Sequence, residues 1–151
     1  MTAVVSALDR TGTGLEYLEK VASGEHGSLP IGDAMGFRLA EVSKGRVVFE
    51  GTPGAAMLNL IGTVHGGYAA AILDSALALS ILSSLGADAD FTTLEIKVNF
   101  VRPVTVGMAV RAEGIVVHAG RRVATSEARL MDGEGRLLAH ATTTCLVLPR
   151  T

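Results

Sequence analysis

The residue best suited to do chemistry in this chain is Asp74, a single acid in an apolar run. Every other residue from Tyr68 to Leu82 is Ala, Ile, Leu, Ser or Tyr. Burying a carboxylate in such surroundings without a compensating partner is costly, so a role outside packing is expected. A solvated helix residue or a structural partner of an arginine fits these apolar neighbours less well. Asp74 is therefore the leading candidate for a catalytic residue.

A polar step, His65-Gly66-Gly67, immediately precedes the apolar run. At a helix start, backbone N–H groups are unpaired and the positive end of the helix dipole points outward. Such an end can hold a developing oxyanion, whereas a bare Gly-Gly pair more often marks a tight turn. The adjacent His65 and the spacing to Asp74 favour the oxyanion interpretation. We expect the His65 ring to brace this site rather than to exchange protons.

The same run predicts one long helix from Gly67 to about Leu85, ended by Gly86. Because this helix is apolar on nearly every face, other structure or another subunit must cover it. With 48% hydrophobic side chains, the 151 residues fit one domain, 1–151, with 1–29 as an N-terminal extension.

Strands are expected on both sides of the long helix. A short helix at 15–22 and a loop at 27–33 come first. Apolar alternation and turn residues then predict two strands before the long helix and about four after it. Their expected positions are 36–42, 46–50, 94–100, 108–118, 121–131 and 136–148. Consecutive hairpins make an antiparallel sheet, so the layout is α+β, with one sheet covering one helix.

This layout, together with residues 59–107, resembles the hotdog-fold acyl-CoA thioesterases, in particular the phenylacetate-degradation type. The resemblance covers roughly residues 30–148. Its motifs, in family order, are His65-Gly66-Gly67 nine residues before Asp74, then Phe100-Val101-Arg102-Pro103, then Gly120-Arg121-Arg122. The resemblance implies a hotdog fold, an antiparallel sheet wrapped around a central helix, and hydrolysis of an acyl-CoA to a free acid and coenzyme A.

The resemblance also implies catalytic roles. The Gly66 amide polarises the thioester carbonyl, and Asp74 is either the nucleophile or the general base that activates water. Asn59 occupies a position where an Asn or Gln contacts the thioester or the attacking water. Thr93 matches a Ser or Thr that holds this water, and Thr92 is a nearly equal candidate.

Substrate contacts are implied in the same way. Coenzyme A carries a 3'-phosphate and a diphosphate, and arginine forks suit phosphate oxygens, although surface arginines are usually only solvated charges. The residues expected to bind substrate are Gly67, Tyr68, Arg102, Gly120, Arg121 and Arg122. Tyr68 is included because it suggests, together with Ala69, Ile72 and Leu82, an apolar pocket that would suit both aromatic and medium-chain aliphatic acyl groups.

Composition and charge limit the binding partners and the cellular compartment that can be expected for this protein. A net charge of -2 without long like-charge blocks argues against a general nucleic-acid binder. The apolar stretch at 68–82 is about 15 residues, short of the roughly 20 that span a bilayer. The single Cys145 fits a reducing compartment, so the cytoplasm is expected. The scattered histidines show no metal-ligand spacing, and no cofactor is expected, since coenzyme A is part of the substrate.

Helix geometry predicts a site shared between subunits. Gly67 and Asp74 are seven residues apart, which is roughly 10 Å along a helix axis. A carbonyl at the helix start is then out of reach of the same chain's carboxylate, so we expect a homo-oligomer, a dimer or a dimer of dimers. The alternatives are a non-catalytic acyl-CoA binding domain and an enoyl-thioester hydratase on the same fold. Asp74 favours hydrolysis, because a binder needs no carboxylate aimed at the carbonyl.

Overall fold

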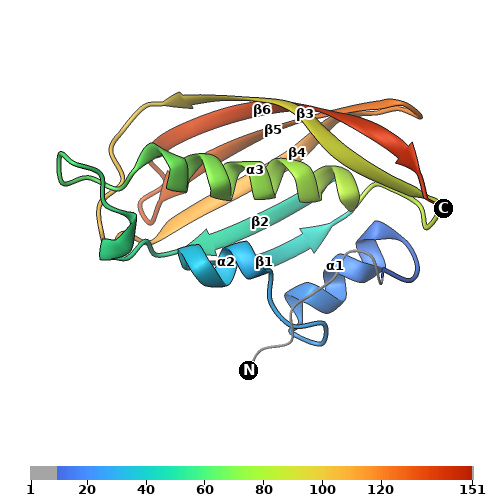
Figure 1. The fold of residues 1–151 in the computed structure, drawn as a ribbon, viewed down its shortest axis with the longest axis horizontal. Helices are drawn as coiled ribbons and strands as arrows, with labels where there is room; N and C mark the ends of the chain where they lie inside the picture. The colour runs from blue at the N-terminus through green and yellow to red at the C-terminus, as the bar shows by residue number, and fades with distance from the viewer. Residues whose placement is uncertain (1–9, 151) are drawn as a thin grey trace.

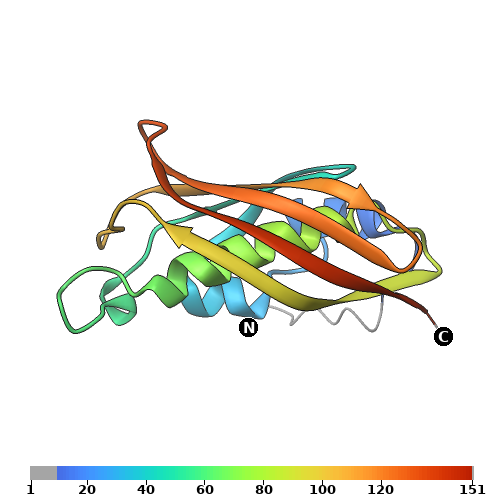
Figure 2. The same ribbon diagram turned by 90° about the horizontal axis from the view of Figure 1, so that it is seen from above.

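The computed structural model describes residues 10–150, so residues 1–9 of the expected N-terminal extension lie outside the described part. Six strands form one antiparallel sheet: β1 (Phe37–Ser43), β2 (Arg46–Gly51), β3 (Ala89–Phe100), β4 (Val110–Ala119), β5 (Val123–Asp132) and β6 (Leu137–Pro149). Their order across the sheet is β1-β2-β4-β5-β6-β3. The sheet curves around one long helix, α3 (Gly66–Leu82), which confirms the predicted hotdog layout (Figures 1 and 2).

Helix α3 begins and ends at polar residues. His65 is its N-cap and Ser83 its C-cap. The predicted end at Leu85 is three residues late, because the chain leaves the helix through tighter turns. In one of these, the Leu85 N–H donates to the carbonyl of Leu82. Within the described part, no helix is both long and apolar enough to cross a membrane.

The sheet approaches the backbone of α3 closely because its central strands carry small residues. A Cβ at Gly114 of β4 would collide with the carbonyl oxygen of Ala76. From β5, the Ser126 hydroxyl donates to the carbonyl of Leu77 at 2.9 Å. Ala112 and Ala128 are buried on the same side of these strands. The helix is therefore held in a fixed position over β4 and β5.

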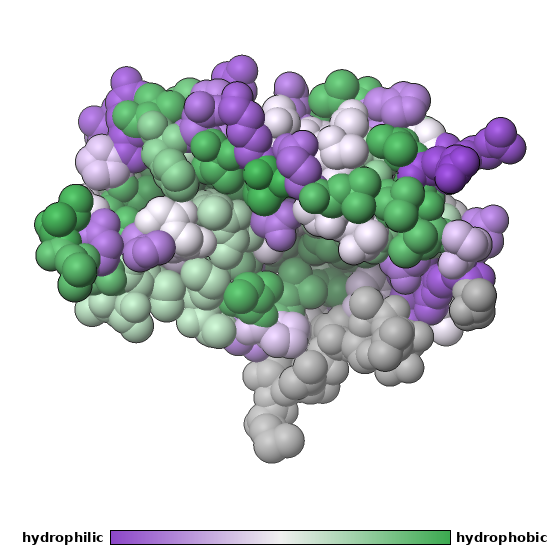
Figure 3. Space-filling model, turned by 45° about the horizontal axis from the view of Figure 1, so that its top comes forward, coloured by the Kyte–Doolittle hydropathy of each residue, from purple (hydrophilic) through white to green (hydrophobic). Residues whose placement is uncertain are grey.

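Strand β3 lies at a free edge of the sheet. It pairs with β6 instead of forming a hairpin with β4, so the expectation of consecutive hairpins is wrong at this strand. A bulge at Leu94 also interrupts the predicted alternation. Ile96 and Phe100 lie opposite Thr143 and Ala139, which are buried, so they belong to the helix side of the sheet. Both are nevertheless exposed, and Figure 3 shows apolar side chains gathered along this side.

Short helices cover the remaining part of the core. Helix α1 (Gly14–Ala22) matches the predicted helix and starts with a capping box between Thr13 and Glu16. Helix α2 (Pro30–Met35) falls largely within the predicted loop, which is therefore wrong there. Pro30 at the first helical position and a left-handed Gly36 after the last are strong start and stop signals. A single 3-10 turn, η2 (Ala55–Met57), precedes the loop that leads to α3.

Candidate functional site

A cavity of about 300 Å³ opens at the N-terminal end of α3. Four of the predicted site residues line it: Asn59, His65, Gly66 and Arg102. Its other walls are mainly apolar and include Ala69, Phe100, Val104, Leu138 and Ala139. The residues come from the loop before α3, the end of β3 and the start of β6, which are far apart in the sequence. The fold thus brings the predicted oxyanion group into a partly apolar recess.

His65 determines which backbone amides of α3 are free. Its Nδ1 accepts a hydrogen bond from the Gly67 N–H at 2.8 Å, and its carbonyl accepts one from the Tyr68 N–H at 2.9 Å. Within residues 10–150, the Gly66 N–H has no acceptor. The predicted brace at His65 is thus present as a helix cap. Gly66 offers a donor to a ligand, whereas the amide of Gly67, predicted to contact substrate, is already engaged.

Asn59 holds the loop that precedes the helix. Its Oδ1 accepts from the backbone N–H groups of Ile61 and Thr63, and its Nδ2 donates to the Thr63 hydroxyl at 2.8 Å. Further along the loop, the Val64 N–H donates to the carbonyl of Val104. The side chain of Asn59 therefore has partners within its own loop. A direct contact with a thioester or water stays a prediction and would have to share these hydrogen-bonding groups.

Asp74 lies halfway along α3, away from this cavity. It is half-buried, and one carboxylate oxygen, Oδ1, is buried without a hydrogen-bond partner among the described residues. Burial raises the pKa of Asp74 above its ordinary value. Burial also raises the pKa of the Cys145 thiol, and the nearby carboxylate of Asp74 contributes to this shift. Helix α3, which carries Asp74, packs against β6, the strand that carries Cys145.

The same place on the sheet holds Thr93. Its hydroxyl lies 3.8 Å from the Cys145 sulfur, across the β3–β6 pairing. Thr92, the nearly equal candidate, is exposed, whereas Thr93 is half-buried. Of the two threonines, Thr93 is thus the one in contact with Cys145, and its role beside Asp74 stays a prediction.

The remaining predicted substrate residues lie elsewhere. Gly120, Arg121 and Arg122 form the β4–β5 turn, and the first two line a cavity of about 440 Å³ together with Gly86 and Asp88 beyond the C-terminal end of α3. Both arginines are exposed. Within one chain this turn is separated from Gly66 by the length of α3, roughly 25 Å.

Tyr68 is not accessible to a ligand in this structure. Its side chain is 1% exposed and packs edge-on against Phe37. Its hydroxyl has no hydrogen-bond partner among the described residues and abuts Gly51, where a Cβ would collide with it. This burial raises the pKa of Tyr68 to about 12. In this structure the ring of Tyr68 is part of the hydrophobic core. Its predicted contact with the substrate therefore stays a prediction.

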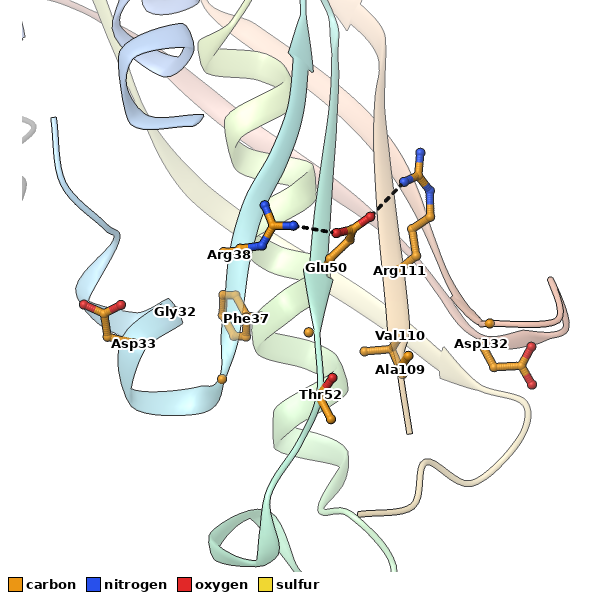
Figure 4. A pocket seen from close by; sticks show the side chains of 13 residues that line it. Gly32, Asp33, Phe37, Arg38, Glu50, Thr52, Ala109, Val110, Arg111 and Asp132 are labelled. Atoms are coloured by element: carbon orange, nitrogen blue, oxygen red, sulfur yellow. Dashed lines mark hydrogen bonds and ion pairs between the residues drawn. The ribbon is translucent and has the colours of Figure 1, made fainter. Parts of the chain in front are cut away.

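A larger cavity of about 700 Å³ lies among α2, β1, β2 and β4 (Figure 4). Its charged side chains are already paired with one another or with neighbours. Glu50 accepts from Arg38 at 2.9 Å and from Arg111 at 3.4 Å, and Asp132 pairs with Arg136 at 2.7 Å. None of the predicted site residues lines this cavity. The smaller cavity at Gly66 is therefore the better candidate for the functional site.

Sequence reasoning missed one wall of that site. Phe100 was predicted only as an alternating strand residue, yet its ring lies against Gly66. Its position in the Phe100-Val101-Arg102-Pro103 motif was the sequence feature that could have indicated a place in the site. Among residues 10–150, no three His, Cys, Asp or Glu side chains gather in a way that could hold a metal ion.

Comparison with known proteins identifies the family. The model of the thioesterase superfamily matches residues 61–139. The phenylacetic acid degradation protein PaaI from Thermus thermophilus, solved as a mutant, shares 32% identity and a TM-score of 0.72, over 78% of this chain and 97% of that one. A conserved protein from Pseudomonas aeruginosa shares 31% identity and a TM-score of 0.74, over 79% and 94%.

A hypothetical thioesterase from Streptococcus pneumoniae, solved with coenzyme A, shares 25% identity and a TM-score of 0.72, over 78% of this chain and 91% of that one. A search of curated proteins finds no match. The family model covers more than half of the chain, including Gly66 and Asp74, and the solved relatives share the sheet wrapped around α3. The chain therefore belongs to the thioesterase superfamily, within the hotdog fold.

Proposed function

We propose that this protein hydrolyses acyl-CoA thioesters to a free acid and coenzyme A. The observation that carries the proposal is a complementary pair of unsatisfied groups. The Gly66 N–H is a free donor in a recess at a helix N-terminus, and the Asp74 Oδ1 is a buried acceptor without a partner among the described residues. A solved relative is a hypothetical thioesterase with coenzyme A bound, which supports the substrate class. Thiol release from a panel of acyl-CoA esters tests the proposal directly.

Each group has a defined task in this reaction. The Gly66 amide and the helix dipole stabilise the negative charge that develops on the thioester oxygen. Asp74 either attacks the carbonyl carbon itself or takes a proton from the attacking water. In both cases the carbon–sulfur bond breaks, and the sulfur leaves with the electron pair as the coenzyme A thiolate. If Asp74 is the base, the oxygen of the attacking water becomes part of the free acid. If Asp74 is the nucleophile, a mixed anhydride forms on its carboxylate, and water then hydrolyses the anhydride to release the free acid and regenerate Asp74. In this proposal Thr93 holds the attacking water.

One chain cannot bring the two groups together. Gly66 and Asp74 are eight residues apart on α3, about 12 Å along its axis, and Asp74 does not line the Gly66 cavity. A second copy with its helix antiparallel would place its Asp74 opposite Gly66. It would also cover the half-buried side of α3 and the exposed apolar residues of β3. We therefore place the active site between two subunits.

The same arrangement gives the β4–β5 turn a role. It lies beyond the C-terminal end of α3, so an antiparallel partner carries its own Arg121 and Arg122 toward the Gly66 end of the first chain. There the two guanidinium groups would bind phosphates of coenzyme A. The pairing of dimers into tetramers and the cytoplasmic location stay predictions.

Replacing Asp74 should abolish turnover without unfolding the protein. Because burial raises its pKa, the folded state favours the protonated form, and the free energy of unfolding falls as the pH rises from the ordinary value through the raised one. Asp74→Asn should therefore be inactive yet have a higher melting temperature than wild type at pH 7. This difference should shrink below about pH 4, where the carboxyl becomes protonated in both states. Normal kcat in a folded Asp74→Ala or Asp74→Asn protein would exclude the assignment.

Mixed dimers test whether the site is shared. Asp74→Ala and Gly66→Val subunits should each be inactive alone, and their heterodimers should contain one intact site out of two. After subunit exchange at equal concentrations, roughly a quarter of wild-type activity should return. Mixing Asp74→Ala with Asp74→Asn subunits is the control and should restore nothing. An active monomer at high dilution would show instead that one chain suffices.

The arginines of the β4–β5 turn should affect binding more than chemistry. Arg121→Ala and Arg122→Ala are expected to raise KM for a CoA ester several-fold and to weaken its dependence on salt, while kcat changes less. Arg129→Ala removes the same charge from an exposed position on β5 and should leave KM unchanged. If all three variants behave alike, Arg121 and Arg122 are only solvated turn residues.

The cap on α3 should matter for activity as well as stability. His65→Ala removes the acceptor of the Gly67 N–H, which should cost about 1 kcal/mol and lower kcat by loosening the Gly66 amide. His65→Asn supplies another acceptor and should restore most of kcat. Thr13→Ala removes the cap of α1 at a similar cost in stability and should leave kcat intact. A His65→Asn protein as slow as His65→Ala would indicate that the imidazole itself takes part in the reaction.

A further inference from the structure

Phe100 is an aromatic side chain in an unusual position. It is the last residue of β3, and its partner across the sheet is the buried Ala139, so it lies on the side of the sheet that faces α3. Its ring is nevertheless 61% exposed. Packing of the described chain therefore does not account for the ring, which lines the cavity at the start of α3.

The ring sits directly against the candidate oxyanion group. A Cβ built on Gly66 would lie 3.1 Å from Cζ of Phe100 and 3.2 Å from its Cε1. The ring thus occupies space that any other residue at position 66 would need. Gly66 and Phe100 therefore line the same cavity next to each other.

The wall that continues from Phe100 is apolar, whereas polar lining residues such as Asn59, His65 and Arg102 lie in other parts of the cavity wall. Ala69, Val104, Leu138 and Ala139 contribute apolar side chains. The Leu138 carbonyl already accepts from the N–H groups of residues 101 and 102, and the Val104 carbonyl accepts from residue 64. The pantetheine arm of coenzyme A carries two amides, which would be left unpaired along this wall at a cost. A hydrocarbon chain has no polar groups that would be left without hydrogen bonds along this wall.

We infer that the acyl group of the substrate lies in this cavity against Phe100, which makes Phe100 a specificity-determining residue. This inference rests on the proposed thioester hydrolysis and deepens it. With the carbonyl oxygen on the Gly66 amide, the first carbons of the acyl chain contact the aromatic ring. The cavity, at about 300 Å³, is at the lower end of small-molecule sites, so it fits a medium-length or single-ring acyl group rather than a long fatty chain.

The test compares acyl chains in wild type, Phe100→Leu and Phe100→Ala, using acetyl-CoA, hexanoyl-CoA and phenylacetyl-CoA. We expect Phe100→Ala to lower kcat/KM for the two larger esters by about tenfold or more, with little change for acetyl-CoA. Phe100→Leu should keep much of the hexanoyl activity. Val117→Ala, which truncates a similarly exposed side chain on β4, is the matched control and should change none of the three. Light scattering checks that each variant keeps the wild-type oligomeric state.

Two results would overturn the inference. An equal loss for all three esters would assign Phe100 to structure or to the coenzyme A arm, and an unchanged profile would remove it from the site. Failure of the proposed function looks different, because wild type would then hydrolyse no ester in the panel. In that case, calorimetric titration with the same esters still tests the acyl site. Preferential binding of hexanoyl-CoA over acetyl-CoA that depends on Phe100 would support it, and equal binding would refute it.

Discussion

Helix α3 has one charged side chain among its seventeen residues, and nearly its whole circumference has to be kept from water. The curved sheet covers one side, and the small residues at Gly114 and Ser126 let the strands approach the helix backbone. This close packing fixes where the two ends of the helix lie. The free amide at Gly66 and the carboxylate at Asp74 therefore have defined positions on a rigid element, as a preorganised site requires.

The residue that caps this helix is suited to the proposed chemistry in one further respect. Aspartate is among the commonest N-cap residues, but a carboxylate there would place a negative charge next to the Gly66 amide. Such a charge would oppose the developing oxyanion on the thioester. His65 supplies an acceptor through Nδ1 without that negative charge. The cap thus stabilises the helix start and leaves the electrostatic effect of the helix dipole available to a ligand.

Local sequence patterns predicted most helices and strands, but they did not predict contacts between segments that are distant in the chain. The unbroken apolar run predicted α3, and alternation with turn residues predicted five strands to within a few residues. Spacing and resemblance singled out Gly66, Asp74 and Thr93. The pairing of β3 with β6 and the contact of Phe100 with Gly66 join segments far apart in the chain, which a local pattern does not contain. Tertiary packing likewise buries the ring of Tyr68, which the apolar run at the helix start had suggested as part of a substrate pocket.

The hydrogen-bonding groups around the Gly66 cavity favour the proposed site between two subunits. Polar groups around the cavity are mostly satisfied internally: Asn59 by its own loop, and the Gly67 N–H by His65. Within the described chain, the Gly66 N–H and the Asp74 Oδ1 have no partner, as is also true of the buried Tyr68 hydroxyl, and about 12 Å of helix separates Gly66 from Asp74. In the proposed mechanism, a thioester carbonyl oxygen would accept from the Gly66 N–H and a water molecule would donate to Asp74, and a second helix would bring its own carboxylate to the first helix's amide.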